Sequence, residues 1–154
     1  MTKEKDIVKD AMDIASNYHD NMVDKYGHSY FEHLERVAER VREMEYDMVD
    51  ETSEIDLYVA AAYLHDVIED TDYSVKELTE KFGEVIAEAV KLLTRDKEET
   101  YADYVTGIKK SVFLEGKIAR VVKLADLFDH LMGATPCPPS LVKRYEKSLY
   151  SLIS

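Results

Sequence analysis

Two of the five histidines in the sequence are followed directly by aspartate, at His19-Asp20 and at His65-Asp66. The first pair stands alone, and we expect His19 to be a packing or surface residue. The second continues into Val67-Ile68-Glu69-Asp70, so three carboxylates gather beside one imidazole. On one continuous helix, at about 100° per residue, these four ionisable groups share an arc. Crowded carboxylates repel one another unless a cation lies among them. The segment therefore indicates either a divalent metal site or a solvated acidic helix end.

Two more residues could complete such a metal site. His33 lies at the start of a predicted helix, and Asp126 lies in the most apolar stretch of the chain. A carboxylate in apolar surroundings needs a partner, which is either a metal or Lys123, three residues earlier. Two imidazoles and two carboxylates suit Mn²⁺, Fe²⁺ or Zn²⁺ and leave coordination positions for water and substrate. The four candidate ligands are His33, His65, Asp66 and Asp126.

The composition places these residues in an ordinary globular chain. Of the 154 residues, 45% are hydrophobic and 34% are charged, which excludes the disordered class and fits a single domain over 1–154. The single cysteine, Cys137, excludes an internal disulfide and a cysteine-based metal cage.

Charge and hydropathy also limit the partners. The net charge of −12 gives no diffuse attraction for nucleic acid or anionic lipid. No run approaches the roughly 18 apolar residues that a membrane span needs, and the N-terminus has no apolar signal core. We therefore expect a cytoplasmic protein that binds neither nucleic acid nor membrane. The sequence carries no signal of its oligomeric state.

Apolar residues recur at helical spacing along nearly the whole chain, and no segment alternates with period two, which predicts an all-α fold. Ser53 is expected to cap one helix, Ser74 and Glu77 to form a capping box, and Leu114-Glu115-Gly116 to form a turn. The expected helices cover about residues 7–22, 30–44, 53–68, 74–83, 84–93, 101–113, 118–132 and 140–153.

Three separated motifs match one family. The order His33, His65-Asp66, Asp126 resembles the HD-domain metal-dependent phosphohydrolases. Residues 64–71, LHDVIEDT, look like the HDxxED segment of the (p)ppGpp hydrolase domains of RelA/SpoT proteins and their small stand-alone relatives. Residues 27–33, GHSYFEH, are similar to that family's G-x-P-Y-x-x-H-P, and residues 122–126 match its V-K-L-A-D. The resemblance covers about residues 10–135 and implies an HD-domain helical bundle.

By this resemblance, the four candidate ligands hold a divalent metal, Mn²⁺ above all, and Glu69 and Asp70 orient and deprotonate the attacking water. The implied activity is hydrolysis of a phosphorylated small-molecule nucleotide, as in the 3′-pyrophosphohydrolysis of guanosine-3′,5′-bis(diphosphate) (ppGpp). The alternatives are an HD phosphohydrolase for another nucleotide or phosphorylated metabolite, and a non-catalytic nucleotide-sensing HD module. Because a pure sensor has no need of Glu69 and Asp70, their presence favours catalysis.

The sequence departs from the family at the nucleotide contacts. The family's Arg before the glycine, which stacks on guanine, is missing from Asp24-Lys25-Tyr26-Gly27. The family's Asn four residues after the last ligand, which contacts the sugar, is His130. Arg36 and Lys123 could reach substrate phosphates or form structural salt bridges instead. The expected substrate contacts are Lys25, Tyr30, Arg36, Lys123 and His130.

Overall fold

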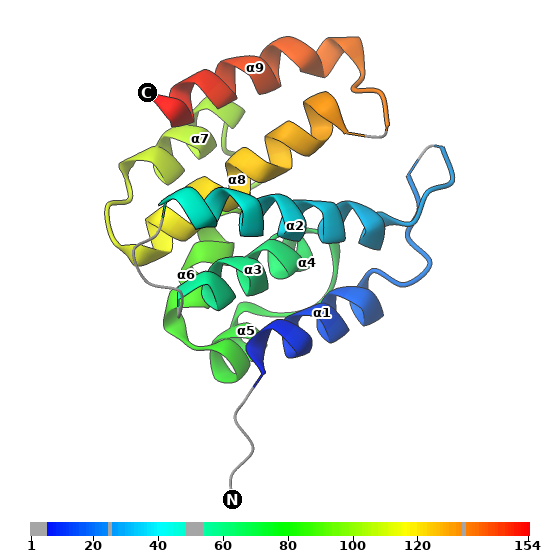
Figure 1. The fold of residues 1–154 in the computed structure, drawn as a ribbon, viewed down its shortest axis with the longest axis vertical. Helices are drawn as coiled ribbons and strands as arrows, with labels where there is room; N and C mark the ends of the chain where they lie inside the picture. The colour runs from blue at the N-terminus through cyan, green and yellow to red at the C-terminus, as the bar shows by residue number, and fades with distance from the viewer. Residues whose placement is uncertain (1–5, 25, 49–53, 134) are drawn as a thin grey trace, which may run out of the picture.

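The computed structural model describes residues 6–24, 26–48, 54–133 and 135–154, which form an all-α bundle (Figure 1). Its helices are α1 (Ile7–Tyr18), α2 (Tyr30–Met48), α3 (Ile55–Leu64), α4 (Val67–Asp70), α5 (Val75–Phe82), α6 (Glu84–Leu92), α7 (Tyr101–Lys110), α8 (Leu114–Met132) and α9 (Pro139–Ile153). The predicted fold class is confirmed. Among the described residues, β-structure is limited to one isolated antiparallel bridge between Val23 and Ser29.

Helix α3 lies at the centre of the bundle. Every residue from Tyr58 to Leu64 is buried, as expected for a helix that is apolar on all sides. It packs against α1, α2, α6 and α8. Ala60, Ala61 and Ala62 are fully buried, and such small side chains let neighbouring helices approach closely. The C-terminal end of α3 is therefore held firmly in place.

Helix α8 forms the second buried element. Most of its residues from Ile118 to Asp129 are buried, including the charged Lys123 and Asp126. It packs against α2, α3, α6, α7 and α9, and Figure 1 shows α9 lying across α7 and α8 at one end of the molecule. The packing of α2, α3 and α8 on one another brings charged side chains from three helices to one place in the interior.

The first helix is shorter than expected. The sequence pattern predicted a helix to Met22, but α1 ends at Tyr18. Asn21 has a φ of 67°, in the left-handed region that asparagine tolerates better than most residues. The chain therefore turns at residues 19–21, before the loop that leads to α2.

The expected helix through the His65-Asp66 pair is broken. Helix α3 ends at Leu64, and Val67–Asp70 forms the separate turn α4. The His65 imidazole donates from Nδ1 to the carbonyl of Ala62 at 2.6 Å and competes for an acceptor that a continued helix would offer to the amide of Asp66. The prediction of one shared helical arc was wrong. The predicted cap Ser53 lies outside the described residues.

Two other helix boundaries were predicted from glycine and capping residues, one at residues 114–116 and one at residues 74–83. The predicted turn at residues 114–116 was wrong, because α7 ends at Lys110 and α8 already begins at Leu114. The capping box of Ser74 and Glu77 is confirmed, and Gly83 ends α5 with a φ of 89°.

None of the helices in the described part of the chain has the length and hydropathy to cross a bilayer.

We expect Gly116→Ala to lower the free energy of unfolding by about 1–3 kcal/mol, because an added Cβ would lie 2.2 Å from the main-chain oxygen of Ser111. Gly107→Ala is the matched control. Gly107 lies in α7 with nothing within 4 Å of an added Cβ, so alanine should raise this free energy by about 0.5–1 kcal/mol. Equilibrium urea unfolding measures both, and an unchanged value for Gly116→Ala would contradict the close approach of residues 111 and 116.

Candidate metal centre

Two predicted ligands, His33 and His65, lie beside the carboxylate of a third, Asp126 in α8. Its Oδ1 lies 3.1 Å from Nε2 of His33, in the first turn of α2, and 3.4 Å from Nε2 of His65, just after α3. Asp66 follows in the chain, and its Oδ2 lies 3.1 Å from the same His65 nitrogen. Residues more than 90 positions apart in the sequence thus share one small volume.

The orientation and burial of the His65 ring indicate that a cation fits this volume. Because Nδ1 donates to the carbonyl of Ala62, the ring is held with Nε2 turned toward the carboxylates of Asp66 and Asp126. This nitrogen is fully buried and has no hydrogen-bond partner. Burial disfavours the charged ring, but Asp66 and Asp126 raise the pKa of His65 above its usual value. A positive charge is therefore favoured here, and a divalent cation could replace the proton.

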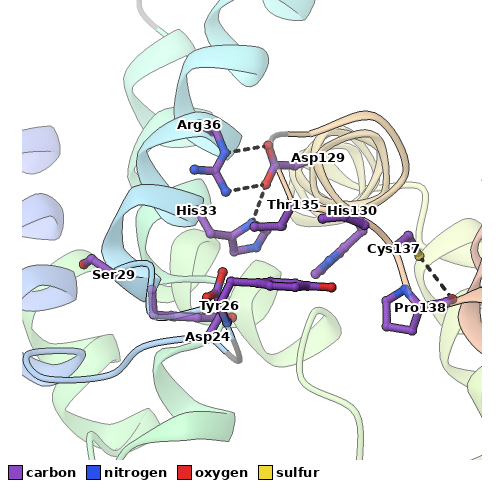
Figure 2. A pocket seen from close by; sticks show the side chains of 12 residues that line it. Asp24, Tyr26, Ser29, His33, Arg36, Asp129, His130, Thr135, Cys137 and Pro138 are labelled. Carbon is purple, nitrogen blue, oxygen red and sulfur yellow. Dashed lines mark hydrogen bonds and ion pairs between the residues drawn. The ribbon is translucent and has the colours of Figure 1, made fainter.

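His33 is oriented by a residue that the sequence analysis missed, Asp129. Nδ1 of His33 donates to Oδ2 of Asp129 at 2.7 Å, and Arg36 donates to the same carboxylate from Nε and Nη2 at 2.9 and 3.2 Å (Figure 2). Burial raises the pKa of Asp129, but these two partners lower it to about 2. Such carboxylates fix the ring orientation of metal-binding histidines. Asp129 is a carboxylate in the same apolar helix as Asp126, so the argument that singled out Asp126 could have found it.

His130 also lies at the centre. Its Nε2 is 3.3 Å from Oδ1 of Asp126, and its ring stacks on Tyr145 of α9 with centroids 5.2 Å apart. The potential ligand atoms form two overlapping groups within 4.8 Å, which are His33 with Asp126 and His130, and His33 with His65 and Asp66. The residue expected to contact substrate thus lies among the candidate ligands.

Glu69 and Asp70 line a polar cavity of about 300 Å³ together with Asp66 and Asp126. Partial burial, followed by the charges of Asp66 and Asp70, raises the pKa of Glu69. Behind them, the buried His19 stacks on Tyr30 with centroids 5.2 Å apart, and its Nε2 lies 3.7 Å from Oδ2 of Asp70. The predicted catalytic carboxylates therefore open onto the same cavity as two of the predicted ligands.

Three cations line the polar cavity, and the sequence analysis had predicted only one of them, Lys123, to lie near the substrate. Arg95, Lys123 and Arg144 all line it and all face the ring of Tyr101, at 5.6, 5.4 and 3.8 Å from its centroid. Nε of Arg144 is buried without a hydrogen-bond partner. In the sequence, Arg95 and Arg144 look like surface cations. Arg95 lies in the loop between α6 and α7, and Arg144 reaches the cavity because α9 packs on α7 and α8.

Three predicted substrate contacts already have partners within the protein. Tyr30 donates its hydroxyl to Oδ2 of Asp66. Nζ of Lys123 donates to Oδ2 of Asp126 at 2.9 Å, and Arg36 is paired with Asp129, so both cations form the structural salt bridges that were the alternative. Lys25 lies outside the described residues.

A second cavity, of about 160 Å³, is lined by His33, Tyr30 and His130 of the centre and by loop residues, and is here called the loop cavity. Figure 2 shows Asp24, Tyr26 and Ser29 from the α1–α2 loop on one side and Cys137 and Pro138 from the α8–α9 segment on the other. Oδ1 of Asp24 accepts from the amides of Tyr26 and His28 at 2.8 and 2.9 Å, which shapes the loop. Tyr30 and His130 line both cavities, so a single ligand could extend past the centre from one cavity to the other.

An all-α bundle with converging histidines and aspartates defines a candidate metal-binding helical domain. Residues 11–112 match the HD domain family, and the chain belongs to that family, as its resemblance indicated. The family match ends before α8, so the position of Asp126 in the centre rests on the structure.

Individual relatives are similar over most of this chain. It is 34% identical over 143 residues to the guanosine-3′,5′-bis(diphosphate) 3′-pyrophosphohydrolase of Haemophilus influenzae, which covers 87% of this chain and 20% of that protein. The enzyme of the same name from Aquifex aeolicus is 30% identical over 127 residues, 80% of this chain and 17% of that protein. The chain thus spans about a fifth of the length of these curated relatives.

The fold also occurs in solved structures, and one of them is similar over nearly the whole chain. It is that of a metazoan orthologue of SpoT described as hydrolysing ppGpp, with a TM-score of 0.71 over 99% of this chain and 88% of that chain. Because the two sequences are 22% identical, this likeness concerns the fold.

We expect Asp129→Asn to weaken divalent metal binding by about 10–100-fold, because a neutral amide holds the His33 ring less firmly and leaves Arg36 without its ion pair. Asp13→Asn, an exposed change in α1, is the matched control. Competition for Zn²⁺ with a chromophoric chelator gives both dissociation constants. Equal affinities for the two variants would show that Asp129 does not support the centre.

Proposed function

We propose that this chain is a metal-dependent (pyro)phosphohydrolase that acts on a phosphorylated nucleotide in the manner of a ppGpp 3′-pyrophosphohydrolase. The observation that carries the proposal is the polar cavity, in which candidate metal ligands, two further carboxylates and three cations face one space. The names of the curated relatives support the same activity. A cytoplasmic location stays a prediction from the sequence.

We assign His33, His65, Asp66 and Asp126 as ligands of a divalent cation. Their mixed nitrogen and oxygen donors fit Mn²⁺, which the family resemblance implies, and also Fe²⁺ or Zn²⁺. When bound, such a cation supplies Lewis acidity that neutralises phosphoryl charge and lowers the pKa of water. Tyr30 supports the site from the protein side, because its hydroxyl holds the Asp66 carboxylate through a hydrogen bond.

Glu69 and Asp70 are assigned to the proton transfers. They lie on α4, beyond the break in the helix, and project into the polar cavity without occupying the centre itself. The raised pKa of Glu69 brings its carboxylate closer to the range in which a general base both accepts and releases a proton. The pair would orient water against a phosphorus atom and take its proton.

Arg95 and Arg144 are assigned to the phosphate groups of the substrate, and Lys123, which is paired with Asp126, adds its positive charge to the same cavity. A chain with a net charge of −12 repels anions overall, so a polyphosphate needs local positive charge to enter the polar cavity. Arginine is suited to phosphate because its planar fork can donate two parallel hydrogen bonds. The phosphate end of the substrate would therefore lie in the polar cavity.

The nucleoside end is assigned to the loop cavity. Tyr26 contributes an aromatic ring to its wall, and Pro136 and Pro138 also line it. Base stacking on an aromatic ring tolerates any base, whereas the family's guanine-stacking Arg is absent. We therefore propose a nucleotide substrate that is held by stacking more than by base-specific hydrogen bonds.

We expect the double variant Glu69→Gln, Asp70→Asn to keep its metal and its fold but to lose about 10²–10⁴-fold in kcat, since general acid–base catalysis is worth that much. Asp72→Asn, an exposed change just after α4, is the control. Phosphate and pyrophosphate release over a nucleotide panel with Mn²⁺ measures turnover, and elemental analysis measures the metal. Loss of metal would make these carboxylates ligands, and unchanged turnover would remove them from the mechanism.

We expect kcat/KM for ppGpp to exceed that for its adenine counterpart by less than about 10²-fold, which corresponds to roughly 2.7 kcal/mol. The reason is that no arginine is available to stack on the base before Gly27. A stronger guanine preference would show that another residue reads the base. Release of phosphate from simple monophosphates alone would favour the alternative of a different HD phosphohydrolase.

A further inference from the structure

We propose that His130 is a fifth ligand of the metal centre and that it shifts the metal preference of the site toward Zn²⁺ relative to Mn²⁺. The inference rests on the proposed metal site and adds to it a residue that the sequence analysis had expected to contact substrate. Three contacts of the described residues carry it.

The first contact is the position of the His130 nitrogen. Oδ1 of Asp126 is surrounded by three imidazole nitrogens, which lie 3.1 Å away in His33, 3.3 Å in His130 and 3.4 Å in His65. Donor atoms about 2.1 Å from one cation lie about 3.0 Å apart in octahedral and about 3.4 Å apart in tetrahedral geometry. Nε2 of His130 therefore lies about as far from Oδ1 of Asp126 as the corresponding nitrogens of His33 and His65, which are already assigned as ligands.

The second contact leaves only one oxygen of Asp126 free for a cation. Oδ2 of Asp126 accepts from Nζ of Lys123 at 2.9 Å. The other oxygen, Oδ1, faces the three histidines. A carboxylate with one oxygen held by an ammonium group and the other facing three imidazoles is arranged to bind a metal through that second oxygen.

The third contact fixes the ring of His130. His130 follows Asp126 by four residues in α8, which places both side chains on the same face of the helix. Its ring stacks on Tyr145 at 5.2 Å and lies 4.9 Å from the His33 ring, centroid to centroid. Figure 2 shows the ring extending from α8 into the space beside His33. A partly exposed side chain held between two aromatic neighbours loses little further freedom when it binds a cation.

A third imidazole changes which metals the centre prefers. Imidazole nitrogen is a favoured ligand of Zn²⁺ and Fe²⁺, whereas Mn²⁺ is suited by carboxylate and water. Asparagine at this position would leave two imidazoles and two carboxylates. His130 would therefore strengthen Zn²⁺ binding more than Mn²⁺ binding.

The affinity experiment compares wild-type protein with His130→Asn, with dissociation constants for Zn²⁺ and Mn²⁺ taken from chelator competition. His28→Asn is the matched control, because His28 is an exposed histidine that lines neither cavity. We expect His130→Asn to weaken Zn²⁺ binding by more than about 10-fold and Mn²⁺ binding by a smaller factor. Thermal unfolding of the metal-free variants checks that the fold is retained.

The spectroscopic experiment records the side-chain ¹⁵N resonances of the histidines with and without Zn²⁺. We expect Nε2 of three histidines to shift on Zn²⁺ binding and one of these signals to be missing from His130→Asn. If only two signals shift, or if His130→Asn keeps the wild-type Zn²⁺ affinity and alters only the KM for nucleotide, His130 contacts the substrate and the inference is wrong.

Failure of this inference is distinguishable from failure of the proposed function. His65→Ala removes a ligand of the proposed site and should abolish tight binding of both metals. If wild-type protein binds neither metal, the proposed metal site itself is wrong. If wild-type protein binds metal and His65→Ala does not, but His130→Asn binds like wild type, only the role of His130 is overturned.

Discussion

The buried carboxylate of Asp126 is the group on which the rest of the centre depends. An isolated charge in the interior of a protein is strongly unfavourable, and Asp126 is stable there because Lys123 and three imidazoles surround it. These partners come from α2, from the end of α3 and from α8 itself. The positions of the three helices therefore depend on one another through Asp126, since a shift of any one of them would leave a buried charge without its partner.

The break after α3 separates the His65-Asp66 pair from the Glu69-Asp70 pair, although all four residues lie within one short motif. His65 and Asp66 stay at the end of the buried helix, while Glu69 and Asp70 lie on the separate turn α4. A continuous helix would have presented all four groups along one arc. The turn instead leaves His65 beside Asp126 and Asp66 beside His65, while Glu69 and Asp70 line the polar cavity from the separate turn.

The C-terminal helix α9 takes part in the site and does more than complete the fold. Arg144 supplies one of the cations of the polar cavity, and the neighbouring Tyr145 supports the His130 ring. Both side chains reach the centre because α9 packs across α7 and α8. The HD-family match covers residues 11–112, so Arg144 and Tyr145 lie outside the matched residues.

The sequence by itself determined the all-α class, the capping box at Ser74 and the short list of residues that could hold a metal. These features are local or motif-encoded, because helical periodicity, caps and the His-Asp spacing can be read within a few residues. Only the tertiary structure decided that Asp129 orients His33 and that Arg144 reaches the polar cavity. It also showed that Gly116 marks a close approach to Ser111 inside a helix, where the sequence suggested a turn. The physical reason is that these roles depend on contacts between helices, whose geometry follows from the packing of the whole core and from no single segment.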